Sequence, residues 1–292
     1  MSATWAGLVV TNLEYIEEAT EGTFPTNPAM VFLAQTAKWT PDLEMDITDF
    51  RRLGSEDPFK ILQGKQIYKS TLEFTIANST FIKYGIAAAG GGAGSIDKAL
   101  SIGMSIKIAG VENFIKMTRS RINSLKITAS PAKPEILCTA EILHDDTTTP
   151  STTDYKGIGT HATADATAPW TYVDGGADPI TWGSALPVEE ITLNFARNVM
   201  MKYVMGAAKA KYSLPTKRGI TGDLSTIWLN TSQEADLKAN TVRNLVWVLK
   251  SAVSTLTITS ASLHKLGREK DANATDIIME KYGLTALSAS IT

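Results

Sequence analysis

The histidines of this sequence are the residues with the widest chemical range, and their spacing limits what they can do. His144, His161 and His264 are far apart, and none has a second histidine at zinc-ligand spacing. His144 stands beside Asp145 and Asp146, a grouping that can bind a metal weakly. Such a short pattern is far more typical of a solvated turn that closes a strand, so no metal site is predicted.

The single cysteine and two glycine-rich runs also have structural interpretations. Cys138 lies in an alternating apolar run, where a small buried hydrophobe is expected rather than a nucleophile. GIGTHA at 157–162 has the spacing of a dinucleotide-binding loop, but it follows no apolar strand and opens no helical pattern. GGGAG at 90–94 lacks the Lys-Ser/Thr pair of a phosphate-binding loop. We therefore predict no catalytic residue, no cofactor and no enzymatic activity.

Acidic residues form one regular pattern, in which Asp42, Glu44 and Asp46 alternate with apolar residues. Side chains two apart on a strand project in parallel, so these carboxylates do not converge on a substrate as a catalytic pair does. Each residue alone indicates a solvated strand face. A face of this kind repels phosphates, whereas each favourable phosphate contact adds to nucleic-acid affinity.

Composition indicates an ordinary globular protein with room for a substantial core. The chain has 292 residues, of which 43% are hydrophobic and 20% charged, and its formal net charge is -2. Lysines and arginines are scattered rather than grouped, which disfavours tight nucleic-acid binding. The sequence begins without the features of a signal peptide, and no apolar run approaches the roughly 20 residues that span a bilayer. A single cysteine fits best with a reducing compartment during assembly.

The elements that would position these residues are mostly strands. Period-two alternation predicts strands over 42–48 and 67–78, joined by a long turn-rich excursion. A short helix follows from Asn78 or Ser79 to about residue 88, and further strands are predicted around 102–108, 125–127 and 136–142. Residues 146–185 are rich in Thr, Asp and Gly and predict a long connection, with one strand near Trp170 and Tyr172.

The second half of the sequence repeats the plan of the first. EITLNFA at 190–196 matches 42–48 at an offset of 148, and 216–230 matches 64–78 at an offset of 152, which makes the second loop four residues longer. A capped helix again follows, from Thr231 or Ser232 with Glu234 in a capping box. We predict a mainly β protein with flanking short helices, built by tandem duplication of a two-sheet β-sandwich or barrel unit. The first unit covers 1–145, the connection 146–185, and the second unit 186–292, with its first strand possible from 168.

The repeated arrangement resembles the tail tube proteins of siphovirus-like tailed phages and related archaeal tailed viruses. The resemblance rests on the Gly-Ser-Glu-Asp-Pro turn at 54–58, the Gly-Lys pair at 64–65, and the runs SLKITASPAKPEILCTAEIL at 124–143 and PWTYVDG at 169–175. It covers nearly the whole chain. The second half departs from the pattern, because it has YVMGAAKAKYSLP at 203–215 in place of the Gly-Ser-charged-Asp-Pro turn.

This resemblance implies a structural virion protein that forms rings, which stack into the tail tube through which double-stranded DNA passes without specific binding. Two units per chain make a trimeric ring pseudo-hexameric, and a hexamer of whole chains is the alternative. The implied partners are other copies and other tail proteins (tape measure, tail terminator, baseplate or tip), with no membrane. Residues predicted to face the lumen are Asp42, Glu44, Asp46 and Glu190; those predicted in inter-ring loops are Gly54, Asp57, Pro58, Phe59, Ile61, Val204 and Met205.

Two other functions fit the sequence. A two-domain β-sandwich binding module would use the aromatic residues Trp170, Tyr172 and Trp182, for instance to bind carbohydrate. The tube of a contractile injection device would share the fold described above. A hydrolase has the least support, because no nucleophile, base and orienting residue can be nominated.

Overall fold

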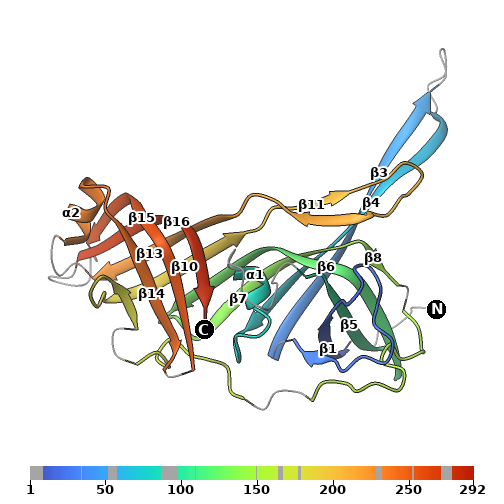
Figure 1. Ribbon diagram of the computed structural model, residues 1–292, viewed down its shortest axis with the longest axis horizontal. Coiled ribbons are helices and arrows are strands. Elements are labelled where there is room, and N and C mark those ends of the chain that lie inside the picture. Colours follow the sequence, from blue (N-terminus) through green and yellow to red (C-terminus); the bar gives the residue numbers. More distant parts are fainter. Residues whose placement is uncertain are drawn as a thin grey trace, which may run out of the picture.

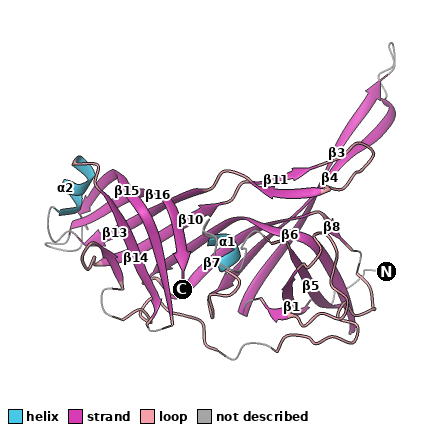
Figure 2. Ribbon diagram, in the orientation of Figure 1, coloured by secondary structure: helices cyan, strands magenta, loops and turns pink. Residues whose placement is uncertain are grey.

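The described residues of the chain fold into antiparallel strands with two short helices, as Figures 1 and 2 show. This computed structural model describes residues 9–33, 35–51, 58–86, 98–108, 110–148, 150–163, 167–176, 179–227, 232–251, 253–270 and 278–292. The prediction of a mainly β protein is therefore confirmed.

The first half contains β1 (Val9–Glu17), β2 (Val31–Phe32), β3 (Gln35–Arg51), β4 (Pro58–Thr75), α1 (Lys83–Ile86), β5 (Leu100–Ile108), β6 (Val111–Ser130), β7 (Lys133–His144) and β8 (Asp146–Thr147). The second half contains β9 (Ile180–Trp182), β10 (Val188–Ala196), β11 (Val199–Lys202), β12 (Tyr212–Pro215), β13 (Gly219–Ile227), α2 (Ser232–Lys238), β14 (Val242–Lys250), β15 (Ser254–Lys270) and β16 (Ile278–Ile291).

The two halves have the same strand order. Neighbouring strands in the first half run β3-β4-β7-β6-β5-β1, and those in the second run β10-β13-β16-β15-β14-β9. Even the irregularities repeat: the register shifts between Ile122 and Ser124 in β6, and between Leu263 and Lys265 at the matching place in β15. The sequence repeat thus corresponds to a repeat of topology.

Strand register corrects one detail of the sequence comparison. Leu43 of β3 pairs with Tyr68, and Phe195 of β10 pairs with Ile220, so both strands of this hairpin repeat at an offset of 152. The offset of 148 predicted for the first strand is wrong by four residues, and the second loop is no longer than the first. An alternating pattern looks the same after an even shift, so alternation alone does not fix register.

A long turn-rich loop was predicted between the strands at 42–48 and 67–78. The described residues of this segment are instead mostly strand. β3 and β4 stay paired from Gln35 and Thr75 out to Arg51 and Pro58, which forms an arm that extends beyond the sheets (Figure 1). In the second half β11 and β12 form the corresponding arm, because Val199 pairs with Pro215 as Ile47 pairs with Gln63.

A single ladder joins the two halves. The last part of β6 pairs with β7 on one side and with β10 on the other, where Thr128 lies opposite Thr192. The result is a continuous run of eight strands, β3-β4-β7-β6-β10-β13-β16-β15, which we call the long sheet. One contiguous hydrophobic cluster covers its inner face across both halves, and it includes Leu72, Ile127, Leu193 and Leu224. Each such side chain contributes about 1.5–3 kcal/mol by leaving water.

Helix α1 covers the joint between the halves. It packs against β6, β10 and β16, and Gly85 lies so close to Leu125 that a Cβ there would meet its side chain at 2.7 Å. The predicted extension of this helix to residue 88 lies outside the described residues. The second helix begins at Ser232, where a cap was predicted; Thr231, the other predicted cap, is outside them.

The strand predicted near Trp170 is absent from that segment as described. Thr171 makes an isolated bridge with Glu135, and the strand of this region is β9, which pairs with β14 of the second half. The connection between 146 and 185 therefore ends in a strand that belongs by pairing to the second half.

His144 is buried, not solvated as its position beside two aspartates suggested. Its Nε2 and Nδ1 each lie 2.7 Å from a serine Oγ, of Ser70 and Ser120 respectively, and its ring stacks on Trp39. Burial disfavours the charged ring and lowers the pKa of His144 to about 3. The neutral imidazole is thus a structural link between β4, β6 and β7.

We expect this histidine to make stability depend on pH. The unfolded chain takes up a proton near pH 6.5 and the folded chain only near 3, so stability is lost as pH falls through this window. Between pH 6.5 and 5 the unfolding free energy of the wild type should drop with a slope approaching about 1.4 kcal/mol per pH unit. His144→Gln should lack this component in urea denaturation measured across the same range. Parallel pH profiles for the two proteins would contradict the assignment.

Candidate functional surface

Polar side chains line the outer face of the long sheet on every strand whose side chains the structure describes. Because alternate residues point to opposite faces, the register places Glu190, Thr192 and Asn194 of β10 on this face and Ile191, Leu193 and Phe195 in the core. We call it the polar face. Its other members include Thr40 and Thr71 in the first half and Thr221, Ser225 and Thr285 in the second.

Charges of both signs are interspersed on the polar face. The register places these carboxylates on it: Asp42, Glu44, Glu73, Glu141, Glu190 and Asp223. The lysines at corresponding positions are Lys38, Lys69, Lys126, Lys133 and Lys281. Carboxylates outnumber lysines in this set, so the face has no basic stripe for phosphates.

Two lysines at one end of this face form ion pairs with neighbouring carboxylates. The Lys69 ammonium lies between two carboxylates of β3: it is 3.2 Å from an Asp42 oxygen and also pairs with Glu44. Hydrogen bonds from Lys69 to Glu44 and Asp42 raise the pKa of the ammonium. Lys38 pairs with Glu73 at 3.8 Å. These pairs satisfy the cations within the sheet and leave them less available to phosphate oxygens.

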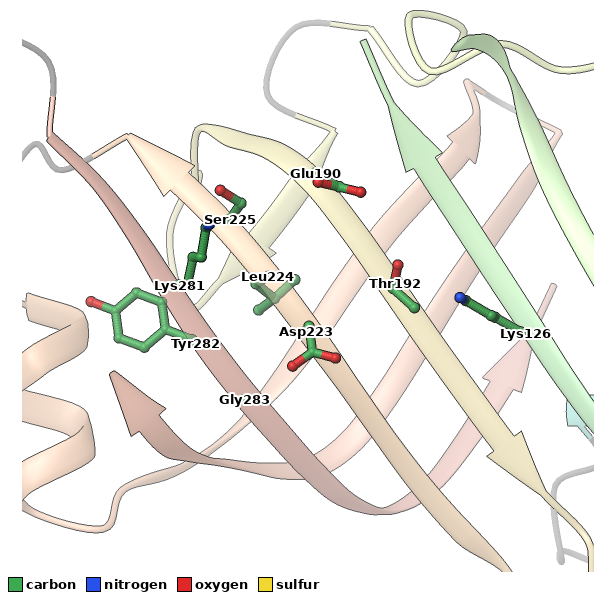
Figure 3. A pocket seen from close by; sticks show the side chains of 9 residues that line it. All are labelled: Lys126, Glu190, Thr192, Asp223, Leu224, Ser225, Lys281, Tyr282 and Gly283. Carbon is green, nitrogen blue, oxygen red and sulfur yellow. The ribbon is translucent and has the colours of Figure 1, made fainter. Parts of the chain in front are cut away.

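A shallow pocket lies near the middle of the polar face (Figure 3). Its floor is formed by β6, β10, β13 and β16, and Lys126, Glu190, Asp223 and Lys281 contribute charged groups to its lining. The side chains stand apart along parallel strand directions and do not converge on one point. This arrangement differs from a catalytic site, in which the reactive groups converge on one substrate.

The structure describes the exposure of three of the four residues predicted to face the lumen, and whether they line a lumen stays a prediction. Asp42, Glu44 and Glu190 lie exposed on the polar face, at positions the alternation correctly assigned to solvent. Asp46 falls on β3 at a register shift between Met45 and Ile47. Leu43 is one of the apolar residues that alternate with these carboxylates, and period-two alternation predicts it on the inner face, but it is 50% exposed.

The predicted loop residues divide between strand and turn. Pro58, Phe59 and Ile61 lie on β4 within the first arm, whereas Gly54 and Asp57 lie outside the described residues. Val204 and Met205 lie in the turn between β11 and β12, and the Met205 side chain is fully exposed. The apolar tip of the second arm thus faces solvent in the single chain.

The second arm is held against the first half by two arginines that sequence reasoning did not single out. Buried Arg121 donates from Nε to Ser213 Oγ of β12 (3.0 Å) and from Nη2 to Glu21 Oε1 (3.1 Å). Arg119 donates to Asp145 Oδ2 (2.9 Å) and to the Ala210 carbonyl (3.3 Å). We call these contacts of Arg119 and Arg121 the clasp. At the matching places of β15 the chain has Ser260 and Ser262, so the clasp is not repeated in the second half.

His161 belongs to another polar cluster that the sequence did not reveal. Its Nδ1 lies 3.0 Å from Glu14 Oε1 and its Nε2 3.1 Å from Asp154 Oδ2, while its ring stacks on Phe114. Burial raises the pKa of the Glu14 carboxyl. The cluster ties the connection to β1. Among the described residues no group of three or more His, Cys, Asp or Glu is arranged to hold a metal ion.

The aromatic residues of the alternative binding module do not form a surface. Trp170 and Trp182 are buried in the core, and the Trp182 Nε1 donates to Asp236 Oδ2 at 3.0 Å. Of the three, Tyr172 alone is exposed. A carbohydrate platform needs exposed rings, so the geometry disfavours that function.

Comparison with known families supports one of the remaining interpretations. A family model described as phage tail tube protein matches residues 10–288. The chain belongs to the phage tail tube protein family. The match spans both halves and the connection between them, and it confirms the resemblance drawn from the repeated hairpins.

Membership in the tail tube family places the protein in the virion tail as a structural component. It also implies association with other copies and with other tail proteins. No individually curated protein matched the chain. In the described part of this tail tube protein no helix is long and apolar enough to cross a membrane.

The clasp predicts a measurable link between the second arm and the first half. Arg121→Met removes the two hydrogen bonds to Ser213 and Glu21, and it should lower the unfolding free energy by about 1.5–3 kcal/mol. Hydrogen exchange of residues 199–215 should accelerate more than exchange in β13. Lys217→Met, at an exposed position, serves as control. Unchanged exchange in the arm would show that the arginine does not hold it.

Proposed function

We propose that this protein assembles into closed rings that stack into a tail tube, with the polar face lining the conduit for DNA. The observation that carries the proposal is the long sheet itself. It has one apolar face buried in the core, one polar face without a basic stripe, and, among the described residues, a free edge at each end, formed by β3 and by residues 263–270 of β15.

The free edges argue for assembly. An edge strand presents unpaired backbone N–H and C=O groups, and soluble proteins usually block or close such edges. Closing the sheet around a ring pairs every edge with another and removes the hazard. The lumen is then the polar face, because the opposite face is occupied by the core.

A lining with this chemistry suits passage of duplex DNA. Each phosphate that pairs with a lysine or arginine adds affinity and therefore friction. On the polar face Lys69 and Lys38 are already paired with carboxylates, and Thr and Ser hydroxyls fill much of the remainder. The DNA would meet a hydrated surface with few sites at which to bind.

The arms supply the axial contacts. Both arms extend from the same side of the long sheet. We propose that the tips of the arms contact the next ring. The residues concerned are Gly54, Asp57, Pro58, Phe59 and Ile61 on the first arm and Val204 and Met205 on the second. The repeat in topology supports two units, 1–145 and 186–292, joined by 146–185. A ring then contains three chains with six similar units, or six chains. The tube would be built in the host cytoplasm and would meet a tape measure protein, a tail terminator and a tip or baseplate.

Assembly is tested by negative-stain electron microscopy of the purified protein over a concentration series. We expect rings and hollow tubes with a lumen wide enough for duplex DNA. A protein that stays monomeric at every concentration, and also when it is added to tail initiation complexes, would overturn the proposal.

The orientation of the polar face is tested by reversing its charge. Glu190→Lys combined with Asp223→Lys adds two cations where phosphates pass, so tubes should form normally but DNA ejection should slow, most strongly at low salt. Glu112→Lys, exposed on the other sheet, is the matched control. Ejection at the wild-type rate from virions with the double variant would show that this face is not luminal.

A further inference from the structure

The turn between β11 and β12 presents an apolar tip that is exposed in the single chain. Val204 and Met205 stand at this tip, and the Met205 side chain is fully exposed. The Ala207 amide donates to the Val204 carbonyl at 3.1 Å, and Gly206 adopts a φ of 85°, which closes the turn. Methionine adapts its shape to irregular apolar surfaces, so an exposed methionine at the apex of a turn suits contact with another surface.

The tip is held in place by the first half of the chain. The Tyr203 hydroxyl donates to the Gln66 carbonyl of β4 at 2.8 Å, and the Gln66 amide donates to the Ala208 carbonyl at 2.8 Å. These two bonds lie on either side of the turn, and the clasp fixes the strand that follows. The tip therefore needs little ordering when it binds, which lowers the entropic cost of a contact.

An apolar pocket lies at the other end of the second half. It has a volume of about 550 Å³, within the roughly 300–1,000 Å³ of pockets that hold a bound group. Tyr172, Val173 and Ile227 of its lining are 40%, 61% and 38% exposed, and prolines, Leu186 and Met279 supply much of the remainder. Exposed apolar side chains gathered around a hollow are typical of a binding surface.

The strands show that the tip and the pocket lie at opposite ends of the long sheet. β10 runs from Val188 at the pocket to Ala196, after which the chain enters β11, and β13 runs back from Gly219 to Ile227 at the pocket. Each strand has 9 residues, a length of about 30 Å at roughly 3.3 Å per residue. Rings stacked with one polarity bring the arm-bearing end of one ring against the pocket end of the next.

The segments that form the tip and the pocket have opposite charge. Residues 199–218, the second arm and its base, contain five lysines and arginines and no aspartate or glutamate. Residues 171–190, which supply most of the pocket lining, contain four aspartates and glutamates and no lysine or arginine. Among the described residues that line the pocket Glu189 alone is charged, and it stands at the register shift between Val188 and Glu190. Opposite charges steer such surfaces together and disfavour incorrect pairings.

The first half lacks this complementarity. The first arm and its base, residues 47–66, have four basic and three acidic residues. Residues 19–38 correspond to the pocket segment at the offset of 152, and they contain one acidic and one basic residue. Each chain therefore has one apolar tip on a basic arm and one apolar pocket in an acidic segment, which match one to one.

We propose that the tip of the second arm of one copy seats in this pocket of a copy in the next ring. The inference rests on the proposed function and specifies the contact by which rings stack. Met205 enters beside Val173 and Ile227, and Lys202, which is exposed near the base of the tip, faces Glu189. Because the tip and the pocket are different surfaces, the contact is heterologous and repeats along the tube.

Paired cysteines in assembled tubes test the seating. Met205→Cys with Ile227→Cys places one thiol on the tip and one in the pocket, at opposite ends of the same chain. The control, Met205→Cys with Leu287→Cys, uses a position that is 79% exposed but lies at the arm-bearing end of β16, where Ala286 pairs with Ile220. After mild oxidation we expect disulfide-linked chains on denaturing gels, about tenfold more than from the control, because a disulfide needs its Cα atoms within about 7 Å.

The outcomes of the crosslinking separate this inference from the proposed function. Tubes that form while the tip and pocket thiols do not crosslink would overturn the seating and leave the function standing. A crosslink from Pro58→Cys with Ile227→Cys in its place would assign the pocket to the first arm and would also overturn the seating. Absence of tubes in the wild type would instead count against the function itself. The native Cys138 is buried and does not compete.

A charge exchange gives a second measurement that needs no cysteine. Lys202→Glu and Glu189→Lys should each raise the critical concentration for tube assembly about two- to fivefold, since an ion pair is lost and like charges meet. The double variant restores opposite charges and should assemble near the wild-type concentration. Lys107→Glu, exposed on β5, is the control and should leave assembly unchanged. A double variant that assembles no better than either single variant would contradict the seating.

Discussion

The pairing of β6 with β10 is the interaction on which the rest of the molecule depends. Without it the chain would be two separate sandwiches, each with exposed edges and an incomplete core. With it, eight strands form one sheet, the hydrophobic cluster becomes continuous, and α1 of the first half becomes part of the core of the second. The same pairing aligns the strands of both halves so that their polar residues lie on one face.

The long sheet has one mainly apolar and one mainly polar face because period-two alternation holds on both sides of the joint. Residues such as Leu193 face the core while Thr192 and Asn194 face solvent, and the ladder keeps neighbouring strands in phase. Binding or catalysis would require side chains that converge, and here they stand in parallel. The resulting polar face is a shallow, hydrated surface that is nearly balanced in charge.

Sequence reasoning recovered the class of the fold and the repeat because both depend on local alternation and turn residues. It placed Asp42, Glu44 and Glu190 on a solvent face for the same reason. It missed the register offset and the length of the arms, since an even shift preserves alternation and turn-forming residues such as Pro58 also occur in strands at an arm. The Arg119 and Arg121 clasp and the burial of His144 were beyond its reach, because both depend on segments that are distant in sequence.

The pairing of β6 with β10 within one chain also changes how many encounters are needed to build the proposed ring. A joint made within one polypeptide forms at the effective concentration set by its own chain, whereas a joint between chains requires diffusion and loses translational entropy. In the proposed ring, with two units per chain, every second joint would already be complete when the protein has folded. A duplicated subunit should therefore begin to polymerise at a lower critical concentration than single units with the same edges.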